Sequence, residues 1–374
     1  MYVSERILEQ KMKILLLGDV CPTQKTNENF KKGDLETLFS DTKTLFEGKD
    51  IAFINLECAL TDSENRIKKF GPNLKGCKET AQALKKLGVT VCGLSNNHIF
   101  DFGKEGAIDT LRALDEAGLD YTGFGNDYED SRRDYVVEKD GETVCFIAVC
   151  EHEYSYALDD RMGSRPFDPF DSIIDIRRAK EKYDKVIVIY HGGKEHCRYP
   201  SPRLYKAAHA MAEAGADVVV GQHSHCISCY EQYNGCHIFY GQGNFNFMMP
   251  GAKVEDGWGS CLALEYDTAD GNVTFTPIVE YGDCGVEIAK GDVAKDMLRG
   301  FAERNESLQN GEWLIGWNKF AESMREYYTG IVSNAFVSGS TETQDANFAH
   351  YLDCEAHTDV WRELFPTYNL TNEK

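Results

Sequence analysis

The sequence lacks long hydrophobic runs and any excess of positive charge. The apolar run near the amino terminus covers only Ile14–Leu17, whereas a membrane-spanning helix needs about 20 such residues, and no small-residue cleavage site follows it. We therefore expect no signal peptide, no membrane anchor and a cytoplasmic location. The 40 Lys and Arg face 61 Asp and Glu, a net charge of −21. This balance argues against a nucleic-acid-binding protein, which needs clustered positive charge.

Paired cysteines are lacking as well. The 13 cysteines are odd in number and mostly stand singly in apolar stretches, as Cys92, Cys145 and Cys261 do. In a chain of 374 residues this pattern predicts reduced, buried thiols and no disulfide framework. The ordinary composition, with 42% hydrophobic and 27% charged residues, excludes a disordered, collagen-like or coiled-coil chain.

Short apolar runs alternate with amphipathic stretches, which predicts an α/β protein. The expected strands are Lys13–Leu17, Ile51–Asn55, Val89–Ser95, Val144–Cys150, Lys185–Tyr190, Val218–Gly221 and His237–Gly241. The expected helices are Leu35–Phe46, Thr80–Leu87, Gly106–Ala117, Ile173–Tyr183 and Leu204–Ala214. Asp140-Gly141, Asn234-Gly235 and Asp270-Gly271 predict hairpin turns, so we expect mixed sheets, two of them packed face to face with helices outside.

Three segments follow from this pattern. Residues 1–12 are predicted to be an amino-terminal extension and residues 13–282 the main domain. From residue 283 the sequence becomes helical and aromatic-rich, as in Glu312–Tyr328. We expect residues 283–374 to form a helical appendage without a chemistry-bearing motif.

Polar residues that bind metals or move protons follow several of the expected strands, where loops of α/β proteins present functional groups. They are Asp19, Glu57, Asn97, His98, His191, His223 and His225. Taken singly, each has an ordinary explanation as a helix cap, a surface carboxylate or a hydrogen-bonded loop residue. Together they provide six oxygen and nitrogen ligands and a spare histidine, and they predict a hydrolytic centre with two cations.

The motifs in their order resemble a known family. The runs G-D-V, I-N-L-E, S-N-N-H-I-F-D-F-G, H-G-G-K-E, G-A-D-V-V-V-G-Q-H-S-H and Y-G-Q-G-N-F, between residues 13 and 247, are similar to those of the CapA family. These are poly-γ-glutamate capsule biosynthesis proteins of the calcineurin-like metallophosphoesterase superfamily. The resemblance implies a four-layer core of two packed β-sheets flanked by helices, with a metal centre at one edge.

The resemblance also implies roles for individual residues. Asp19 would bind the first cation, Glu57 would bridge, and His225 would join them, while Asn97, His191 and His223 would complete the other shell. His98 matches the proton-donating histidine. Two positions depart from the superfamily pattern, which opens with D-x-H: Cys21 stands in place of an imidazole, and Glu57 in place of an aspartate. One cation could therefore bind weakly, use Cys21 or be absent.

Other residues of these motifs have weaker claims. Asp101 shapes the loop after His98 or serves only the turn, and Glu195 holds a ligand histidine or is a surface charge. Asn96 and Asn244 are expected to support the loops of the site. Positive charge gathers at Arg66, Lys68, Lys69, Lys75, Lys78, Lys85 and Lys86, which form either a solvated face or a rim that collects anions.

Three functions remain open from the sequence. The first is a hydrolase that uses one or two divalent metal ions (Mn, Fe, Zn or Mg) on a phosphoester or related anionic substrate. The second is a non-catalytic accessory protein that binds poly-γ-glutamate during its synthesis or export. The third is an amide hydrolase that trims this polymer. The expected partner is an anionic small molecule or polymer in each case, and neither nucleic acid nor a membrane.

Overall fold

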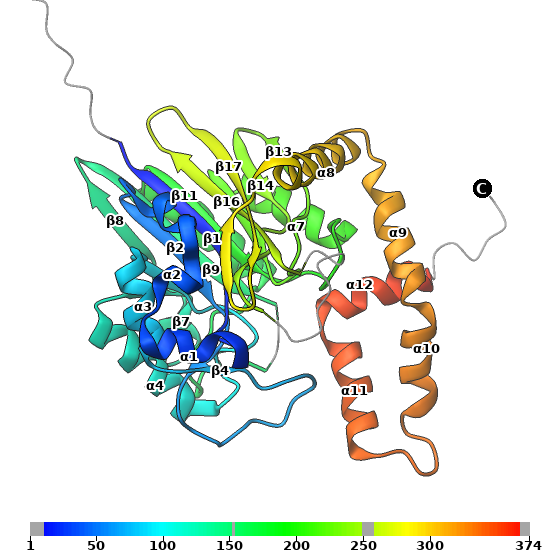
Figure 1. Ribbon diagram of the computed structural model, residues 1–374. Coiled ribbons are helices and arrows are strands. Elements are labelled where there is room, and N and C mark those ends of the chain that lie inside the picture. Colours follow the sequence, from blue (N-terminus) through cyan, green and yellow to red (C-terminus); the bar gives the residue numbers. More distant parts are fainter. Residues whose placement is uncertain (1–10, 152–153, 249–257, 367–374) are drawn as a thin grey trace, which may run out of the picture.

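The computed structural model describes residues 11–151, 154–248 and 258–366, and two β-sheets form its centre (Figure 1). The first sheet contains β1 (Lys13–Val20), β2 (Ile51–Leu56), β5 (Val91–Gly93), β6 (Asp120–Thr122), β15 (Asn244–Asn246), β16 (Ser260–Asp267), β17 (Asn272–Tyr281) and β18 (Gly285–Ile288). Its strand order is β18-β17-β16-β1-β2-β5-β6, with β15 paired to β1. β1, β2, β5 and β6 run parallel, so their carboxyl ends lie at one edge.

The second sheet has the order β13-β14-β12-β11-β9-β8. Its strands are β8 (Tyr135–Lys139), β9 (Glu142–Cys150), β11 (Lys185–His191), β12 (Val218–Gln222), β13 (Tyr230–Tyr233) and β14 (Cys236–Phe239). Two small sheets pair β3 (Ala59–Leu60) with β4 (Lys75–Gly76) and β7 (Phe124–Gly125) with β10 (Gly163–Ser164). β9, β11, β12 and β14 are parallel, so this sheet also has an edge where carboxyl ends meet.

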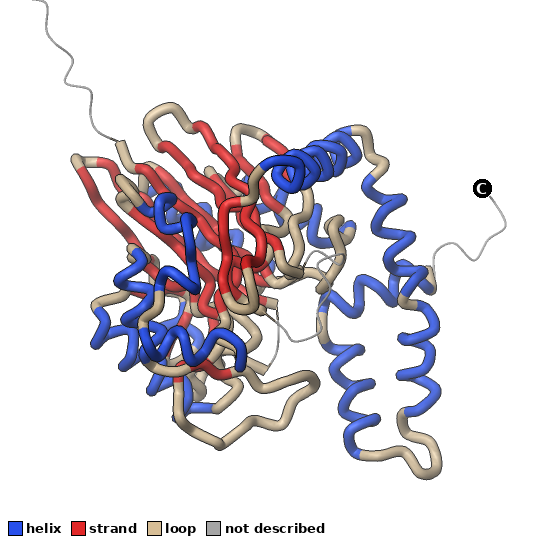
Figure 2. The backbone as a smooth tube through the Cα atoms, viewed as in Figure 1, coloured by secondary structure: helices blue, strands red, loops and turns tan. Residues whose placement is uncertain are grey.

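Helices cover the outer faces of both sheets, and strands fill the middle (Figure 2). On the first sheet lie α1 (Gln24–Lys32), α2 (Leu35–Phe39), the 3₁₀ helix η1 (Ser40–Phe46), α3 (Glu79–Leu87) and α4 (Gly103–Ala117). On the second sheet lie α6 (Pro169–Lys182) and α7 (Pro202–Glu213), while α5 (Tyr128–Ser131) contacts β7. One apolar cluster, with Phe53 and Phe146 stacked at its centre, fills the space between the sheets. The predicted four-layer α/β core is confirmed.

The carboxyl-terminal region is helical: α8 (Gly291–Gln309), α9 (Trp313–Ser323), α10 (Arg325–Asn334), α11 (Glu342–Asp353) and α12 (Glu355–Leu364). α9–α12 stand beside the sheets in Figure 1 and have an apolar cluster of their own, which includes Trp317, Tyr328 and Val360. Cys197, from the loop after β11, packs into the same cluster. The appendage is thereby attached to the main domain on the side of that loop.

Local sequence signals predicted most elements. Each expected strand lies within three residues of an observed one at both ends, and the three predicted turns connect the antiparallel pairs β8–β9, β13–β14 and β16–β17. Asp140 and Asn234 have positive φ angles of 50° and 49°, as the first position of such a turn requires. All 13 cysteines are free, and all except the half-buried Cys284 are buried, as predicted.

Two boundaries need correction. The helix expected over 35–46 is divided: α2 ends at Phe39, and Ser40 has φ 39°. The Thr42 hydroxyl donates to the Phe39 carbonyl, a local bond that competes with a continued α-helix, and a 3₁₀ helix follows. The segment 283–374 does not begin with a helix, because residues 285–288 form β18 through a hairpin with β17; the helices begin at Gly291.

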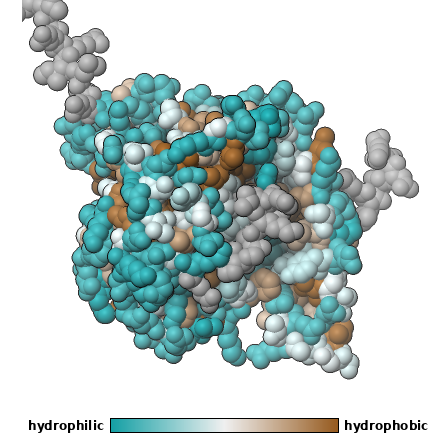
Figure 3. Space-filling model, viewed as in Figure 1, coloured by the Kyte–Doolittle hydropathy of each residue, from teal (hydrophilic) through white to brown (hydrophobic). Residues whose placement is uncertain are grey.

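The proposed extension, residues 1–12, lies outside the described residues except for its last two. Met12 is fully buried between the two sheets, so it belongs to the core. Among the described residues, no helix has the length and apolarity to cross a membrane. The face shown in Figure 3 is mostly hydrophilic, with hydrophobic residues in separate patches, in keeping with the high charge.

Gly18 permits the contact that places the end of β1. A Cβ atom there would lie 1.8 Å from the carbonyl oxygen of Gly243, and the next residue, Asp19, pairs with Asn244 of β15. No side chain fits this approach of two backbones. The strand end that carries Asp19 therefore depends on glycine at position 18.

We expect Gly18→Ala to lower the free energy of unfolding by about 1–3 kcal/mol or more, because β1 and β15 must separate. Gly330→Ala is the control: it lies inside α10 with nothing within 4 Å of the added Cβ, and it should raise stability by about 0.5–1 kcal/mol. Urea unfolding of both variants measures the difference. Equal stability of Gly18→Ala and the wild type would contradict the close approach.

Candidate metal centre

The carboxyl ends of the parallel strands bring the predicted ligands together. Asp19 lies at the end of β1 and Glu57 follows β2, His191 ends β11, and His223 and His225 follow β12. All five are at most 4% exposed. The structure therefore brings these five side chains, which come from both sheets, close together.

Two groups of possible ligands share one carboxylate. Asp19, Glu57 and His225 form one group and Glu57, His191 and His223 the other, with the ligand atoms of each within 4.8 Å of one another. The Oδ1 atom of Asn97 lies 2.9 Å from His191 Nε2, so this amide oxygen adjoins the second group. The arrangement has the form of two adjacent cation sites bridged by Glu57.

Glu57 is the group that most needs a cation. It is fully buried, and neither carboxylate oxygen has a hydrogen-bond donor among the described residues. Burial, and then the charge of Asp19, raise its pKa well above the ordinary value of 4.5. A buried carboxylate without donors is costly, and a bound cation satisfies it. The donor set therefore fits divalent metal ions.

His191 is held between both sheets. The Asn55 amide donates to Asp19 Oδ1 at 2.8 Å and lies 3.1 Å from His191 Nδ1. The other ring nitrogen, Nε2, faces Asn97 and lies 3.4 Å from Glu57 Oε1. Burial lowers the pKa of His191 to about 4, so the ring is neutral near pH 7, the form that binds a metal.

The His223 and His225 loop has an unusual backbone. Their φ angles are 79° and 55°, a left-handed conformation that residues other than glycine rarely adopt and that is enriched at functional sites. Asn244 Oδ1 lies 2.9 Å from His225 Nδ1 and orients that ring. Burial opposes the charged form of His225, but Glu57 and Asp19 outweigh it and raise its pKa to about 9. Without metal, the proton on His225 partly balances the two carboxylates.

His98 lies beside the ligands and has its own partners. Its Nδ1 atom is 2.7 Å from Asp101 Oδ2 and 3.1 Å from Lys69 Nζ, and Lys69 also pairs with Asp101 at 2.5 Å. Burial and then Lys69 lower the pKa of His98 to about 4. The structure thus places one lysine of the predicted basic rim, Lys69, at the site, together with Asp101.

The other residues with weaker claims are placed as follows. Asn96 accepts hydrogen bonds from the backbone of His98 at 3.1 Å and of Ile99 at 3.0 Å, so it shapes the loop. Glu195 Oε1 is 3.9 Å from His223 Nε2 and forms a third group with His223 and His225. Cys21 is buried in an apolar cluster, is in none of the ligand groups of the described residues, and has a raised thiol pKa because of burial.

Sequence reasoning missed two supporting residues. The sequence indicates Asn55 only as the end of a strand, although its amide touches two ligands. Glu151, which follows β9, accepts a hydrogen bond from the Gly193 backbone at 2.8 Å and pairs with Arg203, which fixes the loop after His191. Only their place in the sequence could have indicated these two residues. Both lie at the ends of apolar strands, and the carboxyl ends of these strands meet at the site.

A cavity of about 140 Å³ opens onto the ligands. Its lining includes Asn97, His98, Lys194, Glu195 and His223 from the main domain. His350, Tyr351 and His357 line it from the appendage. A small molecule or the end of a polymer entering this cavity therefore meets the candidate metal centre on one side and α11 and α12 on the other.

Replacing the shared carboxylate tests the centre. We expect Glu57→Gln to weaken Mn²⁺ binding by more than about 10-fold, the lower limit for groups that only orient a ligand. In EDTA the same variant should be more stable than the wild type by about 1 kcal/mol or more, because an unsatisfied buried charge is gone. Calorimetric titration and urea unfolding measure both effects. Glu47→Gln, an exposed carboxylate, is the control and should change neither.

The raised pKa of Glu57 predicts a pH dependence. A carboxyl group whose pKa is higher in the folded than in the unfolded protein binds more protons in the folded state. The free energy of unfolding therefore falls as the pH rises from 4.5, the ordinary pKa, toward the pKa of the folded protein. The stability advantage of Glu57→Gln over the metal-free wild type should therefore grow between about pH 5 and pH 8. An advantage that is constant or shrinks over this range would contradict the assignment.

Comparison with known proteins agrees with the order of the motifs. Residues 13–249 match the family model described as bacterial capsule synthesis protein PGA_cap. The capsule biosynthesis protein CapA of Bacillus anthracis is 29% identical over 72% of this chain and 67% of its own length. The PGA biosynthesis protein CapA of Bacillus subtilis (strain 168) is 31% identical over 64% of each chain. The chain thus spans about two thirds of the length of these relatives.

Among solved structures, a hypothetical protein from Thermus thermophilus is similar at a TM-score of 0.45 and 18% identity, over 75% of this chain and 100% of that one. This likeness is too distant to bear on function. The family match covers more than half of the sequence and includes every predicted ligand. The chain belongs to the bacterial capsule synthesis protein PGA_cap family.

Proposed function

We propose that the protein is a metal-dependent hydrolase of a phosphoester or a related anionic bond. The observation that carries this proposal is the buried carboxylate of Glu57, shared by two ligand groups and without a hydrogen-bond donor among the described residues. Paired cation sites bridged by one carboxylate are typical of enzymes that move a water molecule onto an anionic centre. The cavity above the ligands provides the space for a substrate group.

Asp19, Glu57 and His225 would hold one cation, and Glu57, His191 and His223 the other, with Asn97 beside the second. The three imidazoles among these ligands suit Fe or Zn, and the two carboxylates suit Mn. Divalent cations at this centre supply Lewis acidity and a water of lowered pKa.

His98 is the proton donor in this proposal. Asp101 accepts from Nδ1, so Nε2 of the ring is the atom directed away from Asp101 and His98 lines the cavity. In the free protein burial and Lys69 keep His98 neutral by lowering its pKa. An anionic substrate beside the ring raises the pKa of His98, so the ring would take up a proton from solvent and pass it to the leaving oxygen.

This role predicts a dependence on the leaving group. His98→Ala should lower kcat by about 10²–10⁴-fold for an alkyl phosphate, because its leaving oxygen needs a proton. The loss should be much smaller for p-nitrophenyl phosphate, whose leaving group is stable as an anion. His209→Ala is the matched control, since His209 lies on α7 and bonds Glu231. Steady-state kinetics and metal analysis of the Mn²⁺-loaded proteins provide the comparison.

A loss of equal size on both esters would show that His98 only supports the structure. His98→Ala should keep the metal content of the wild type, whereas His223→Ala should lose metal. Equal turnover by the wild type and both variants would refute the hydrolase proposal.

The relatives are named for capsule and PGA biosynthesis, which supports a second candidate, an accessory protein that binds poly-γ-glutamate. Lys69 and Lys194 line the same cavity, and cations at the centre would bridge carboxylates of protein and polymer. An amide hydrolase that trims the polymer would use the same centre. In both cases the acidic protein needs cations to approach a polyanion.

Incubation with the polymer separates these functions. A polymer-binding protein should retain poly-γ-glutamate in Mn²⁺ and release it in EDTA without shortening it, whereas an amide hydrolase should shorten it. Binding that persists in EDTA would contradict bridging by metal. Size-exclusion chromatography of the polymer, with Glu57→Gln as the metal-site variant, gives the result.

A further inference from the structure

Three side chains of the appendage meet where α11 and α12 join. His350 lies in the last turn of α11, Cys354 lies between the helices, and His357 lies in the first turn of α12. Their ligand atoms are within 4.8 Å of one another. No motif in the sequence predicted this group, and no predicted ligand belongs to it.

The bend at Cys354 creates the group. Cys354 ends α11 and begins α12 with an extended backbone, φ −71° and ψ 126°, so α12 turns away from the axis of α11. As a result the His357 ring approaches the His350 ring, with centroids 5.0 Å apart at 77°. In a continuous helix the positions 350 and 357 would lie two turns apart, about 10 Å along the axis.

The surroundings hold both rings in place. The Tyr328 hydroxyl lies 2.5 Å from His357 Nδ1, and the Tyr351 ring stacks on His357 with centroids 3.7 Å apart. When Nδ1 carries the ring hydrogen and the Tyr328 hydroxyl accepts it, the lone pair that can bind a metal is on Nε2. A hydrogen bond to the second ring nitrogen is the usual way in which a protein orients a metal-binding histidine.

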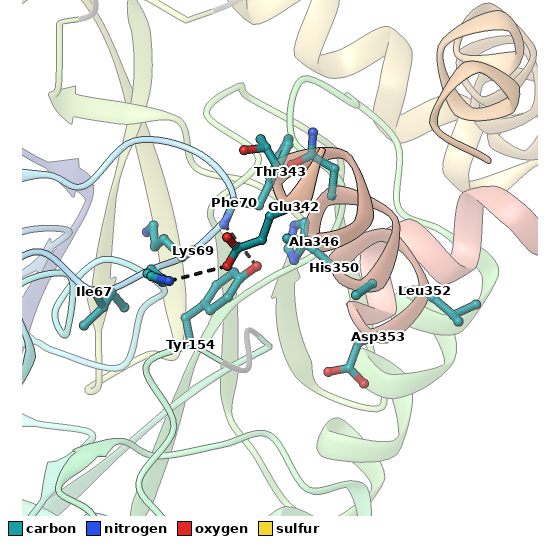
Figure 4. Close-up of a pocket in the computed structure, with 13 residues that line it drawn as sticks. Ile67, Lys69, Phe70, Tyr154, Glu342, Thr343, Ala346, His350, Leu352 and Asp353 are labelled. Atoms are coloured by element: carbon teal, nitrogen blue, oxygen red, sulfur yellow. Dashed lines mark hydrogen bonds and ion pairs between the residues drawn. The ribbon is translucent and has the colours of Figure 1, made fainter. Parts of the chain in front are cut away.

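The main domain supports the other histidine. His350 stacks on Phe70 at 5.0 Å and on Tyr154 at 5.4 Å between centroids. Figure 4 shows His350 on α11 facing the segment of Lys69 and Phe70. The group is also buried: Cys354 is 1% exposed, and the two histidines are at most 9% exposed.

Two imidazoles and one thiol are ligand types that proteins use to bind zinc. Nitrogen and sulfur ligands suit a borderline cation such as Zn²⁺, while Mg²⁺, Ca²⁺ and Mn²⁺ prefer oxygen. Closed structural zinc sites have four protein ligands, whereas three leave a position for another molecule. His350 and His357 line the cavity that also contains His98 and His223, so the group lies at the same cavity as the candidate metal centre.

We propose that His350, Cys354 and His357 bind a Zn²⁺ ion across the cavity from the main metal centre. This site would place a cation opposite the centre and join α11 to α12. It does not depend on the hydrolase proposal, because its ligands are different and the binding requires no turnover.

Cobalt substitution tests this site by a signal that the first centre does not produce. We expect the full-length protein loaded with Co²⁺ to show a near-ultraviolet thiolate-to-cobalt absorption band, because Cys354 is a ligand. Cys354→Ser should abolish it. Cys21→Ser is the matched control: it removes a buried thiol two residues after Asp19, and the band should remain.

A second ligand variant and a folding control separate loss of the site from misfolding. His357→Gln should shift or weaken the band, and it should lower the zinc content by one ion per chain in mass spectrometric metal analysis. Circular dichroism verifies the fold of each variant. The band should persist in Glu57→Gln, which disables the first centre. A wild type without the band, or a Cys354→Ser protein that keeps it, overturns the proposal. The band in a protein without hydrolase activity supports this site and counts against the proposed function, and activity without the band does the reverse.

Discussion

The structure depends on a carboxylate that the fold buries without giving it a hydrogen-bond donor among the described residues. Glu57 is fully buried at the edge where the parallel strands of both sheets end. Such a group destabilises the folded chain unless positive charge reaches it. Without metal, protonation lowers the free-energy cost of burying this charge. The pKa values of His225 and of Glu57 itself are both raised, which favours their protonated forms. The left-handed backbone at His223 and the Asn55 amide are parts of one arrangement that gathers possible cation ligands around Glu57.

The sequence predicted the parts of this arrangement that follow from local pattern. A buried parallel strand followed by a polar residue is visible along the chain, and the carboxyl ends of such strands meet, so Asp19, Glu57 and His191 could be inferred together. The group at His350, Cys354 and His357 was not predictable, because it exists only through the bend at Cys354. The break at Ser40 and the strand β18 were also missed, since tertiary contacts outweigh weak local preferences at helix and strand ends.

A series of hydrogen bonds and ion pairs connects the appendage to the candidate metal centre. The Gly193 backbone donates to Glu151, Glu151 pairs with Arg203, and Arg203 Nε lies 2.9 Å from Asp359 on α12. Ser201, which caps α7, donates to the same Asp359 at 2.6 Å. Removing one member of such a series leaves a buried charge without its partner, which is strongly destabilising. The loop after His191 and the position of α12 are therefore stabilised together, and the cavity between them keeps its shape.

Binding and hydrolysis make different demands on this cavity. A net charge of −21 repels an anionic substrate or polymer, so both proposed functions would need cations at the centre. Only hydrolysis also needs a proton donor beside them. In the proposed hydrolase His98 has this role, and the side chains of Lys69 and Asp101 beside it are only 3% and 0% exposed. Burial of this ion pair carries a desolvation penalty, and binding a polymer does not require such a buried pair. General acid catalysis does require a positioned proton donor, and a buried carboxylate can orient one. The buried pair behind His98 therefore favours hydrolysis over binding alone.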